Sequence, residues 1–308
     1  MTGSGNAACF FVHLAKRLAK RTLPVCTAMA DDFSDSALVL VAHGSTLNAD
    51  SAKTAHQHAD ELRSRRLFAE VRAGFLKQQP EFSGVLQGIE AKRIFIVPLF
   101  ISEGYYTEEL LPRELGFRTN DDRRFARVRH DGKQALHYCG PVGTHPSMTG
   151  ALLARAGAVV EQHPFPRRPS ERETTLFIAG HGTVKNENSR NTVERQAALI
   201  RAKRGYADVR AVFLEEEPRV ESCYELAGTQ NIVVVPFFIS DGLHSREDIP
   251  VKLGEPEKRV QQRLASGQPT WVNPTERRGK RVWYSASIGT EPFLAEVILE
   301  RVIEAAAG

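Results

Sequence analysis

The chain of 308 residues is long enough for two ordinary domains, and its 42% hydrophobic and 25% charged residues are typical of a soluble globular protein. A net charge of +4 is too small for this length to indicate a nucleic-acid partner, and no apolar run is long enough to span a membrane. The four cysteines are scattered without a C-x-x-C pair, which excludes a zinc knuckle and fits a reducing, cytoplasmic compartment.

The first predicted element is an amino-terminal extension, residues 1–34. It has no acidic residue before Asp31, and its lysines and arginines fall between leucines. A basic, acid-free segment can be a transit peptide, but charge interrupts the apolar part too often for a secretory signal. We favour a disordered extension, or a start codon assigned too early with Met29 opening the real chain.

The rest of the chain consists of two copies of one sequence unit. Residues 38–45 match 176–183 and place His43 opposite His181, a shift of 181 − 43 = 138. The same shift relates 71–76 to 209–214 and 96–104 to 234–242. Towards the carboxyl end the shift grows to 289 − 143 = 146, so the second copy carries eight extra residues. We place these within 267–280, and such self-similarity predicts a duplicated fold.

Each copy is predicted to alternate strands and helices. In the second copy, apolar strands at 176–179, 209–214, 232–238 and 282–287 alternate with helices at 191–203, 218–227, 257–264 and 292–307. This order predicts two similar α/β/α domains, each with a four-stranded parallel sheet covered on both faces. We expect the domains at 35–162 and 173–308, joined by a Pro- and Arg-rich linker at 163–172. The duplication supplies both halves of a cleft, so we expect a monomer.

Two histidines of the second copy follow strands. His181 follows the first strand directly, and His244 lies in a predicted loop after the apolar run 232–238. In a doubly wound sheet such loops open on one crevice. Neutral imidazoles bind divalent cobalt, nickel, iron or zinc and accept protons near neutral pH. One such histidine is as well explained as a hydrogen-bonded turn residue, but two in one half favour a site.

Glu215 follows the second strand at the same edge of the predicted sheet. It opens an acidic run, 215–217, and acidic residues commonly begin a helix. We assign that solvated role to Glu216 and Glu217, and we place Glu215 with the histidines in an open metal site.

The first copy departs from this set. Lys77 stands in the place of Glu215 (215 − 77 = 138), and Tyr106 stands in the place of His244 (244 − 106 = 138). Lysine and tyrosine are poor ligands for a divalent metal at neutral pH. We expect the first half to keep the fold without the metal chemistry, with His43, Tyr105, Tyr106 and Lys77 lining a shared pocket.

Together these residues resemble the class II chelatases of the CbiX/SirB type, which insert cobalt or iron into sirohydrochlorin. The resemblance is carried by His-Gly-Thr at His181, Phe-Leu-Glu at 213–215, and V-P-F-F-I-S-D-G-x-H with a following D-I-P at 235–250. It covers residues 37–308, and the double form resembles the long, internally duplicated members.

The resemblance implies that His181 and His244 bind the metal and accept pyrrole protons, with Glu215 assisting in either role. It also implies a reaction without ATP, and the sequence contains no G-x-x-x-x-G-K-[ST] loop. The divalent metal is then a substrate, most simply Co²⁺ with Fe²⁺ or Ni²⁺ as alternatives, and no further cofactor is expected.

The expected partner is a tetrapyrrole with several carboxylates, and neither nucleic acid nor membrane. Cations at the crevice rim should orient those carboxylates, and the basic residues after the two ligand loops, which ordinary surface charge explains equally well, are Lys185, Arg190 and Arg246. We expect Phe237 and Phe238 in the core. Two other classes stay open: a protein that binds metal or tetrapyrrole without catalysis, and a two-domain periplasmic-type binder of a small ligand.

Overall fold

The structure is a computed structural model that describes residues 32–46, 49–119, 124–183 and 187–308. Apart from residues 32–34, the amino-terminal extension lies outside the described residues, and so does Lys185. Residues 33–308 form one unit. Within the described ranges, no helix has the length and apolar character that crossing a membrane requires.

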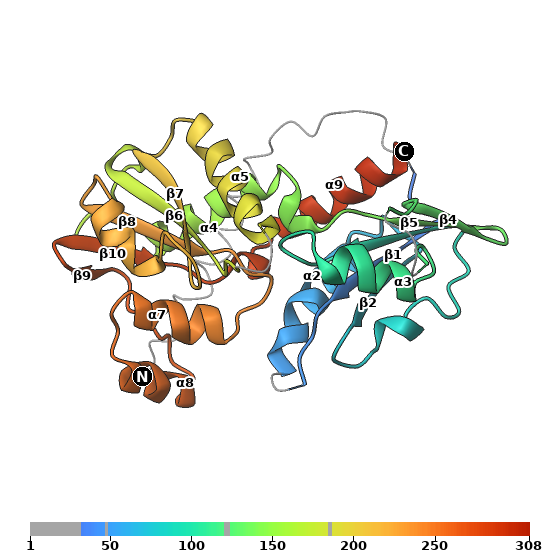
Figure 1. The fold of residues 1–308 in the computed structure, drawn as a ribbon, viewed down its shortest axis with the longest axis horizontal. Coiled ribbons are helices and arrows are strands. Elements are labelled where there is room, and N and C mark those ends of the chain that lie inside the picture. Colours follow the sequence, from blue (N-terminus) through green and yellow to red (C-terminus); the bar gives the residue numbers. More distant parts are fainter. Residues whose placement is uncertain (1–31, 47–48, 120–123, 184–186) are drawn as a thin grey trace, which may run out of the picture. The chain divides into compact units, whose positions relative to one another are not determined.

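Each half of this unit contains a five-stranded sheet (Figure 1). The strand orders are β2-β1-β3-β5-β4 and β7-β6-β8-β10-β9, so the two sheets have the same topology. The strands are β1 (Ser36–Ala42), β2 (Glu70–Phe75), β3 (Arg93–Pro98), β4 (Val128–Asp131), β5 (Gln134–Tyr138), β6 (Thr174–Gly180), β7 (Asp208–Phe213), β8 (Asn231–Pro236), β9 (Thr275–Arg277) and β10 (Lys280–Tyr284).

The prediction of α/β domains from a duplication is confirmed, but the prediction of four strands in each sheet is one strand short. Four strands of each sheet pair in parallel, and a fifth, β4 or β9, pairs antiparallel with its successor. Tight turns at Gly132 and Gly279, with φ of +57° and +71°, join these pairs. The added edge strands are short and largely exposed, so they lack the apolar run that marks the buried strands.

The helices largely follow the predicted pattern. The range 218–227, predicted as one helix, contains only a 3₁₀ turn (Val220–Ser222) and a four-residue helix. The α-helices are α2 (Lys53–Ser64), α3 (Leu111–Glu114), α4 (Met148–Gln162), α5 (Asn188–Ala202), α6 (Cys223–Leu226), α7 (Ile249–Lys252), α8 (Glu257–Ala265) and α9 (Leu294–Ala306).

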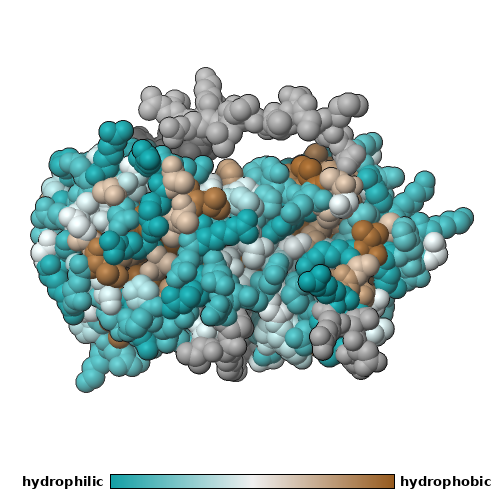
Figure 2. Space-filling view, turned by 45° about the horizontal axis from the view of Figure 1, so that its top comes forward, coloured by the Kyte–Doolittle hydropathy of each residue, from teal (hydrophilic) through white to brown (hydrophobic). Residues whose placement is uncertain are grey.

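The strands of each half divide their side chains between a core that both halves share and an outer core of their own half. In β1, Leu38 and Leu40 join a core that both halves share, whereas Val39 and Val41 join an outer core of the first half. Strand β6 repeats this alternation between the shared core and an outer core of the second half. Burial on both faces explains why these strands are continuously apolar. The outside is mostly hydrophilic on the face shown in Figure 2, with small, separate apolar patches.

The last helix of each half packs on the sheet of the other half. Helix α4 contacts β8 and β10, and α9 contacts β3 and β5, as Figure 1 shows for the red helix α9 beside β5. Arg301 of α9 donates hydrogen bonds to the carbonyl of Pro141 (2.8 Å) and to the hydroxyl of Thr144. At the equivalent position of α4 (301 − 155 = 146), Arg155 donates to the hydroxyl of Thr290 at 3.0 Å. The exchange is therefore reciprocal.

A second pair of equivalent contacts joins the halves. His58 Nε2 donates to the carbonyl of Gly289 at 2.7 Å, and Gln196 (196 − 58 = 138) donates to the carbonyl of Gly143 at 3.1 Å. Burial lowers the pKa of His58, so its ring is held neutral. Glycine is required at 289 because a Cβ there would lie 1.7 Å from the carbonyl oxygen of Ile239.

Candidate functional site

His181 follows β6, and its own turn fixes its ring. Nδ1 donates a hydrogen bond to the carbonyl of Gly182 at 2.6 Å, so Nε2 carries the free lone pair of the neutral ring. Gly182 has φ +69°, and a Cβ there would lie 2.6 Å from Cγ of Glu216. The His-Gly pair therefore combines a backbone conformation that only glycine adopts easily with a fixed tautomer for the histidine.

Glu215 follows β7 and lies beside His181. Its backbone N–H donates to the carbonyl of His181 at 3.0 Å, and its Oε1 is 3.7 Å from His181 Nε2. The parallel pairing of β6 with β7 brings the two strand ends together, as the sequence predicted.

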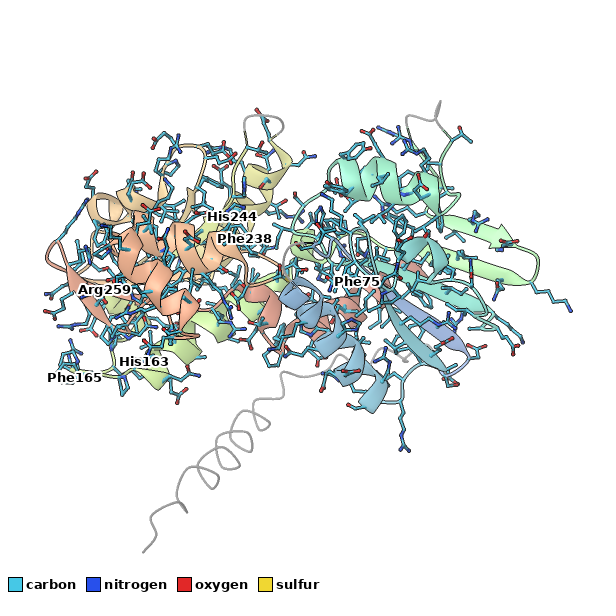
Figure 3. All side chains as sticks on the ribbon, turned by 90° about the horizontal axis from the view of Figure 1, so that it is seen from below. Phe75, His163, Phe165, Phe238, His244 and Arg259 are labelled. Carbon is cyan, nitrogen blue, oxygen red and sulfur yellow. The ribbon has the colours of Figure 1, made fainter. Side chains whose placement is uncertain are left out.

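His244 completes the group from the third strand. Its ring centroid is 4.7 Å from that of His181, with the ring planes at 81°. Phe238 lies on its other side at 5.9 Å, and Figure 3 shows these two residues as neighbours. The predicted loop at His244 is instead a helical turn of π type, His244–Asp248, that leads into α7. His244 Nδ1 lies 2.6 Å from Oδ2 of Asp248.

Buried hydrogen bonds hold the His244 turn in place. The hydroxyl of Tyr284, from β10, donates to the carbonyl of Ser245, and the backbone N–H of Gly242 donates to Oγ of Ser245 at 3.1 Å. Complete burial raises the pKa of Tyr284 well above its ordinary value, so the hydroxyl keeps the proton that it donates. The backbone beside His244 is thus tied to the core of the second half.

A hollow of about 650 Å³ lies over the two histidines, with walls from both halves. The first half contributes His43, Tyr105 and Tyr106, and the second contributes His181 and His244. Most of the remaining lining is apolar and includes Leu99, Phe100, Ile101, Phe237, Phe238 and Ile239. This volume falls within the range of about 300–1,000 Å³ usual for small-molecule sites.

A second hollow of about 370 Å³ shares only His181 and His244 with the first. Glu215 lines it, together with the carboxylates of Glu247, Asp248 and Glu257. The histidine pair therefore stands between an apolar space and an acidic one.

The first half repeats the geometry with different chemistry. The rings of His43 and Tyr106 lie 5.0 Å apart at 88°, and His43 Nδ1 donates to the carbonyl of Gly44 at 2.8 Å. Phe100 stacks on Tyr106 at 6.0 Å, which makes this wall aromatic. The side chain of Lys77 is exposed and is not among the described residues that line the large hollow.

The predicted substrate-binding cations lie in different settings. Arg190 is held by Glu216 and Glu194, both at 2.9 Å, and lies over the ring of Phe213. Arg246 is exposed and lines a separate hollow of about 360 Å³ beside the His244 turn. Neither is among the described residues that line the hollow over the histidines.

The three side chains are of ligand types that suit a divalent ion. Nε2 of His181 lies 3.7 Å from the carboxylate of Glu215, the ring of His244 lies beside that of His181, and imidazole with carboxylate suits cobalt, iron or nickel. Within the described part of the chain, however, no three side chains of His, Cys, Asp or Glu are arranged so that they could close around a metal ion.

Sequence reasoning missed two residues of this region. Asp248 was read only as part of a motif, although its spacing of four residues from His244 gave a signal for contact on a helical turn. Phe238 was assigned to the core, but it is half-buried and faces His244, whereas Phe237 is fully buried as predicted.

Comparisons with known proteins find related sequences over most of the chain. The family model CbiX matches residues 37–159 and again 175–305. A protein of Halobacterium salinarum named a probable sirohydrochlorin cobaltochelatase is 41% identical over 281 residues, which cover 88% of this chain and 92% of that protein. A sirohydrochlorin cobaltochelatase of Methanopyrus kandleri is 30% identical over 138 residues, 42% of this chain and 95% of its own length.

Solved structures share the fold. A multi-domain protein of Deinococcus radiodurans, described as structurally similar to chelatases, has a TM-score of 0.69 and 26% identity. The match covers 88% of this chain and 54% of that longer protein. SirB from Bacillus subtilis, solved with Fe³⁺, has a TM-score of 0.60 at 20% identity, covering 88% of this chain and 96% of its own.

Proposed function

The chain belongs to the CbiX family, and we propose that it inserts a divalent metal, Co²⁺ in the first instance, into sirohydrochlorin or a related tetrapyrrole. The reaction uses no ATP and serves cobalamin or siroheme biosynthesis. The name of the Halobacterium relative supports this choice of metal and substrate. The observation that carries the proposal is the pair His181 and His244, whose ring centroids lie 4.7 Å apart under a hollow of about 650 Å³.

The histidine pair has two tasks that follow one another. Metal insertion takes up one divalent ion and releases the two protons of the pyrrole N–H groups. An imidazole cannot accept a proton at Nε2 while that nitrogen binds the metal. As the ion passes to the ring nitrogens, each freed Nε2 becomes a base beside a pyrrole proton, and Glu215 assists in holding the ion or the proton.

The first half forms the wall against which the macrocycle lies. Its Tyr106 and Phe100 offer flat apolar surface, and His43 adds a hydrogen-bonding nitrogen. The carboxylates of the macrocycle call for cations, for which Arg246, Arg190 and Lys77 remain candidates, and the sequence alone adds Lys185.

The identity of the metal ion is the part of the proposal for which an alternative is nearest, because other divalent ions suit the same side chains. Structures of the Bacillus SirB were solved with Fe³⁺ and with cobalt. Imidazole and carboxylate accept Co²⁺, Fe²⁺ and Ni²⁺ alike, so the donor set does not separate these ions. A protein that binds metal or tetrapyrrole without catalysis is the second alternative.

One experiment separates these functions. The purified chain is mixed with sirohydrochlorin and Co²⁺, Ni²⁺ or Fe²⁺, and the absorption spectrum is followed against the uncatalysed rate. We expect the largest acceleration with Co²⁺. Binding of both partners without acceleration by any ion would identify a non-catalytic protein.

The residue roles are tested in the same assay. His181→Ala and His244→Ala should abolish the acceleration, whereas His43→Ala should only weaken it. His130→Ala, which removes an exposed imidazole on β4, is the matched control and should have no effect. An equal loss from His43→Ala would mean that the first half shares the metal chemistry.

Other expectations stay predictions. We expect a monomer in the cytoplasm, with the two halves at 35–162 and 173–308. Sedimentation of the purified chain measures the first of these properties.

A further inference from the structure

The contact between His244 and Asp248 is the closest that either metal-binding imidazole makes to a carboxylate. Nδ1 and Oδ2 are 2.6 Å apart, and the residues are four positions apart on the helical turn. An ionised carboxylate only accepts hydrogen bonds, so Nδ1 is the donor. A neutral ring that carries its proton on Nδ1 keeps the lone pair on Nε2, as His181 does through the carbonyl of Gly182.

The first half shows that Asp248 is not needed to form the turn. The equivalent turn of π type, Tyr105–Leu110, has Tyr106 in the place of His244 and Leu110 in the place of Asp248 (248 − 110 = 138). The two turns also share their hydrogen bonds. Gly104 N–H donates to the hydroxyl of Thr107 at 3.0 Å, as Gly242 does to that of Ser245 at 3.1 Å.

The support from the sheet is shared as well. Tyr138 of β5 donates to the carbonyl of Thr107 at 2.8 Å, as Tyr284 of β10 does to that of Ser245. The backbone of both turns is therefore held by the same groups. Only the turn with histidine at its first site position has a carboxylate four residues later, whereas Tyr106 is followed by Leu110. The turn therefore forms without the carboxylate, so folding of the turn does not explain Asp248.

We propose that Asp248 is a positioning residue for the metal, which holds His244 in the Nδ1–H tautomer and aims its Nε2 at the hollow shared with His181. The inference rests on the proposed function only in naming the ion. Removal of such a hydrogen-bond partner typically weakens metal binding by about 10- to 100-fold. Because the side chains of His244 and Asp248 are 49% and 43% exposed, we expect a loss at the lower end, about 10-fold.

The first test reads the tautomer of the metal-free protein. Two-bond ¹H–¹⁵N correlation spectra distinguish Nδ1–H from Nε2–H histidines, and the His244 signals are assigned by their absence in His244→Gln. We expect the Nδ1–H form in the unsubstituted chain and a shift towards Nε2–H in Asp248→Ala. An Nε2–H ring in the unsubstituted chain would overturn the proposal, whatever the enzyme activity.

The second test measures Co²⁺ binding by calorimetry, with no tetrapyrrole present and no affinity tag. Asp248→Ala should lose about 10-fold in affinity, and Asp248→Asn should lose less because its amide oxygen still accepts from Nδ1–H. The matched control, Glu109→Gln, removes an exposed carboxylate from the equivalent turn of the first half and should change the affinity by less than about 2-fold. A loss in Asp248→Asn as large as that in Asp248→Ala would reduce Asp248 to a general negative charge and overturn the proposal.

Steady-state kinetics add a readout that a merely structural role would not produce. Asp248→Ala should raise KM for Co²⁺ and leave KM for sirohydrochlorin unchanged, and a parallel rise in both would contradict a role through His244. If the chain binds Co²⁺ and loses affinity in Asp248→Ala but accelerates no insertion, the positioning role stands and the proposed function fails. Absence of Co²⁺ binding by the unsubstituted chain would overturn both.

Discussion

The duplication allows the proposed metal site to be rebuilt in the first half. Tyr106→His with Lys77→Glu places the side chains of the second half on an equivalent backbone. The backbone N–H of Lys77 donates to the carbonyl of His43 at 3.0 Å, as that of Glu215 does to His181. Tyr106 lies 5.0 Å from His43 at 88°, against 4.7 Å and 81° for the histidine pair. We expect the doubly substituted chain to bind a second Co²⁺.

The strength of the new site follows from what it still lacks. His43 already has its tautomer fixed by the carbonyl of Gly44 at 2.8 Å, but a histidine at 106 would have Leu110 where His244 has Asp248. The missing hydrogen bond should make the new site about 10-fold weaker than the native one, or about 1.4 kcal/mol. Adding Leu110→Asp should recover most of that difference.

Calorimetry with Co²⁺ reads both quantities. The stoichiometry should rise from one ion to two, and in a His244→Ala background the three substitutions should create the one remaining strong site. Tyr105→His with Lys77→Glu is the matched control, because it introduces the same groups one residue away from the position that faces His43. A stoichiometry that stays at one, or an equal gain in the control, would refute the equivalence of the two halves.

Three further predictions concern the interface and the rim. Arg301→Met should lower the free energy of unfolding by about 2–5 kcal/mol in urea denaturation, because a buried carbonyl and a half-buried hydroxyl lose their donor, and a change below about 1 kcal/mol would contradict this. Burial lowers the pKa of His58 from 6.5, so at a pH just below 6.5 the unfolded chain binds a proton at this residue and the folded chain does not. Stability should therefore fall as the pH drops below about 6.5 and level off below the folded pKa, and His58→Gln should remove this part of the pH dependence. Tyr105→Ser and Leu243→Ser, at equivalent rim positions that are 54% and 69% exposed, should raise KM for the tetrapyrrole about 5-fold and leave KM for Co²⁺ unchanged. Phe165→Ser, 76% exposed and away from His244 in Figure 3, is their control and should change neither value.

The fold could be predicted from the sequence to the extent that its strands are buried. Apolar runs repeated at a shift of 138, and of 146 for the last of them, indicated the four parallel strands of each half. The edge strands β4 and β9 could not be predicted, because their sequences, which include Arg129 and Glu276, show no regular alternation of apolar and polar residues. Whole-helix amphipathicity also cannot tell which of two equivalent sheets a helix covers, so the exchange of α4 and α9 had no signal in the sequence.

The candidate site could be predicted as far as strand ends determine it. His181 and Glu215 lie together because parallel neighbours end at one edge, which the element order already implies. The helical turn at His244 could not be predicted, because its residues H-S-R-E-D show no apolar periodicity. Its conformation depends on Tyr284, a side chain forty residues further along that reaches it only in the folded sheet (284 − 244 = 40).

Because α4 and α9 pack reciprocally, the main effect of the covalent connection is to keep the two halves at a high effective concentration. If the chain were cut between α4 and β6, each fragment would expose an apolar sheet face and carry a helix that packs on the other fragment in the intact chain. The two pieces would therefore associate as a pair, and the peptide link raises their effective concentration, adding the hydrogen bond from Trp283 Nε1 to the carbonyl of His163 at 2.9 Å. A chain of half this length would need a second copy of itself to close the same sheet. Joining two copies in one chain also allows the equivalent positions to differ, as Lys77 and Tyr106 differ from Glu215 and His244.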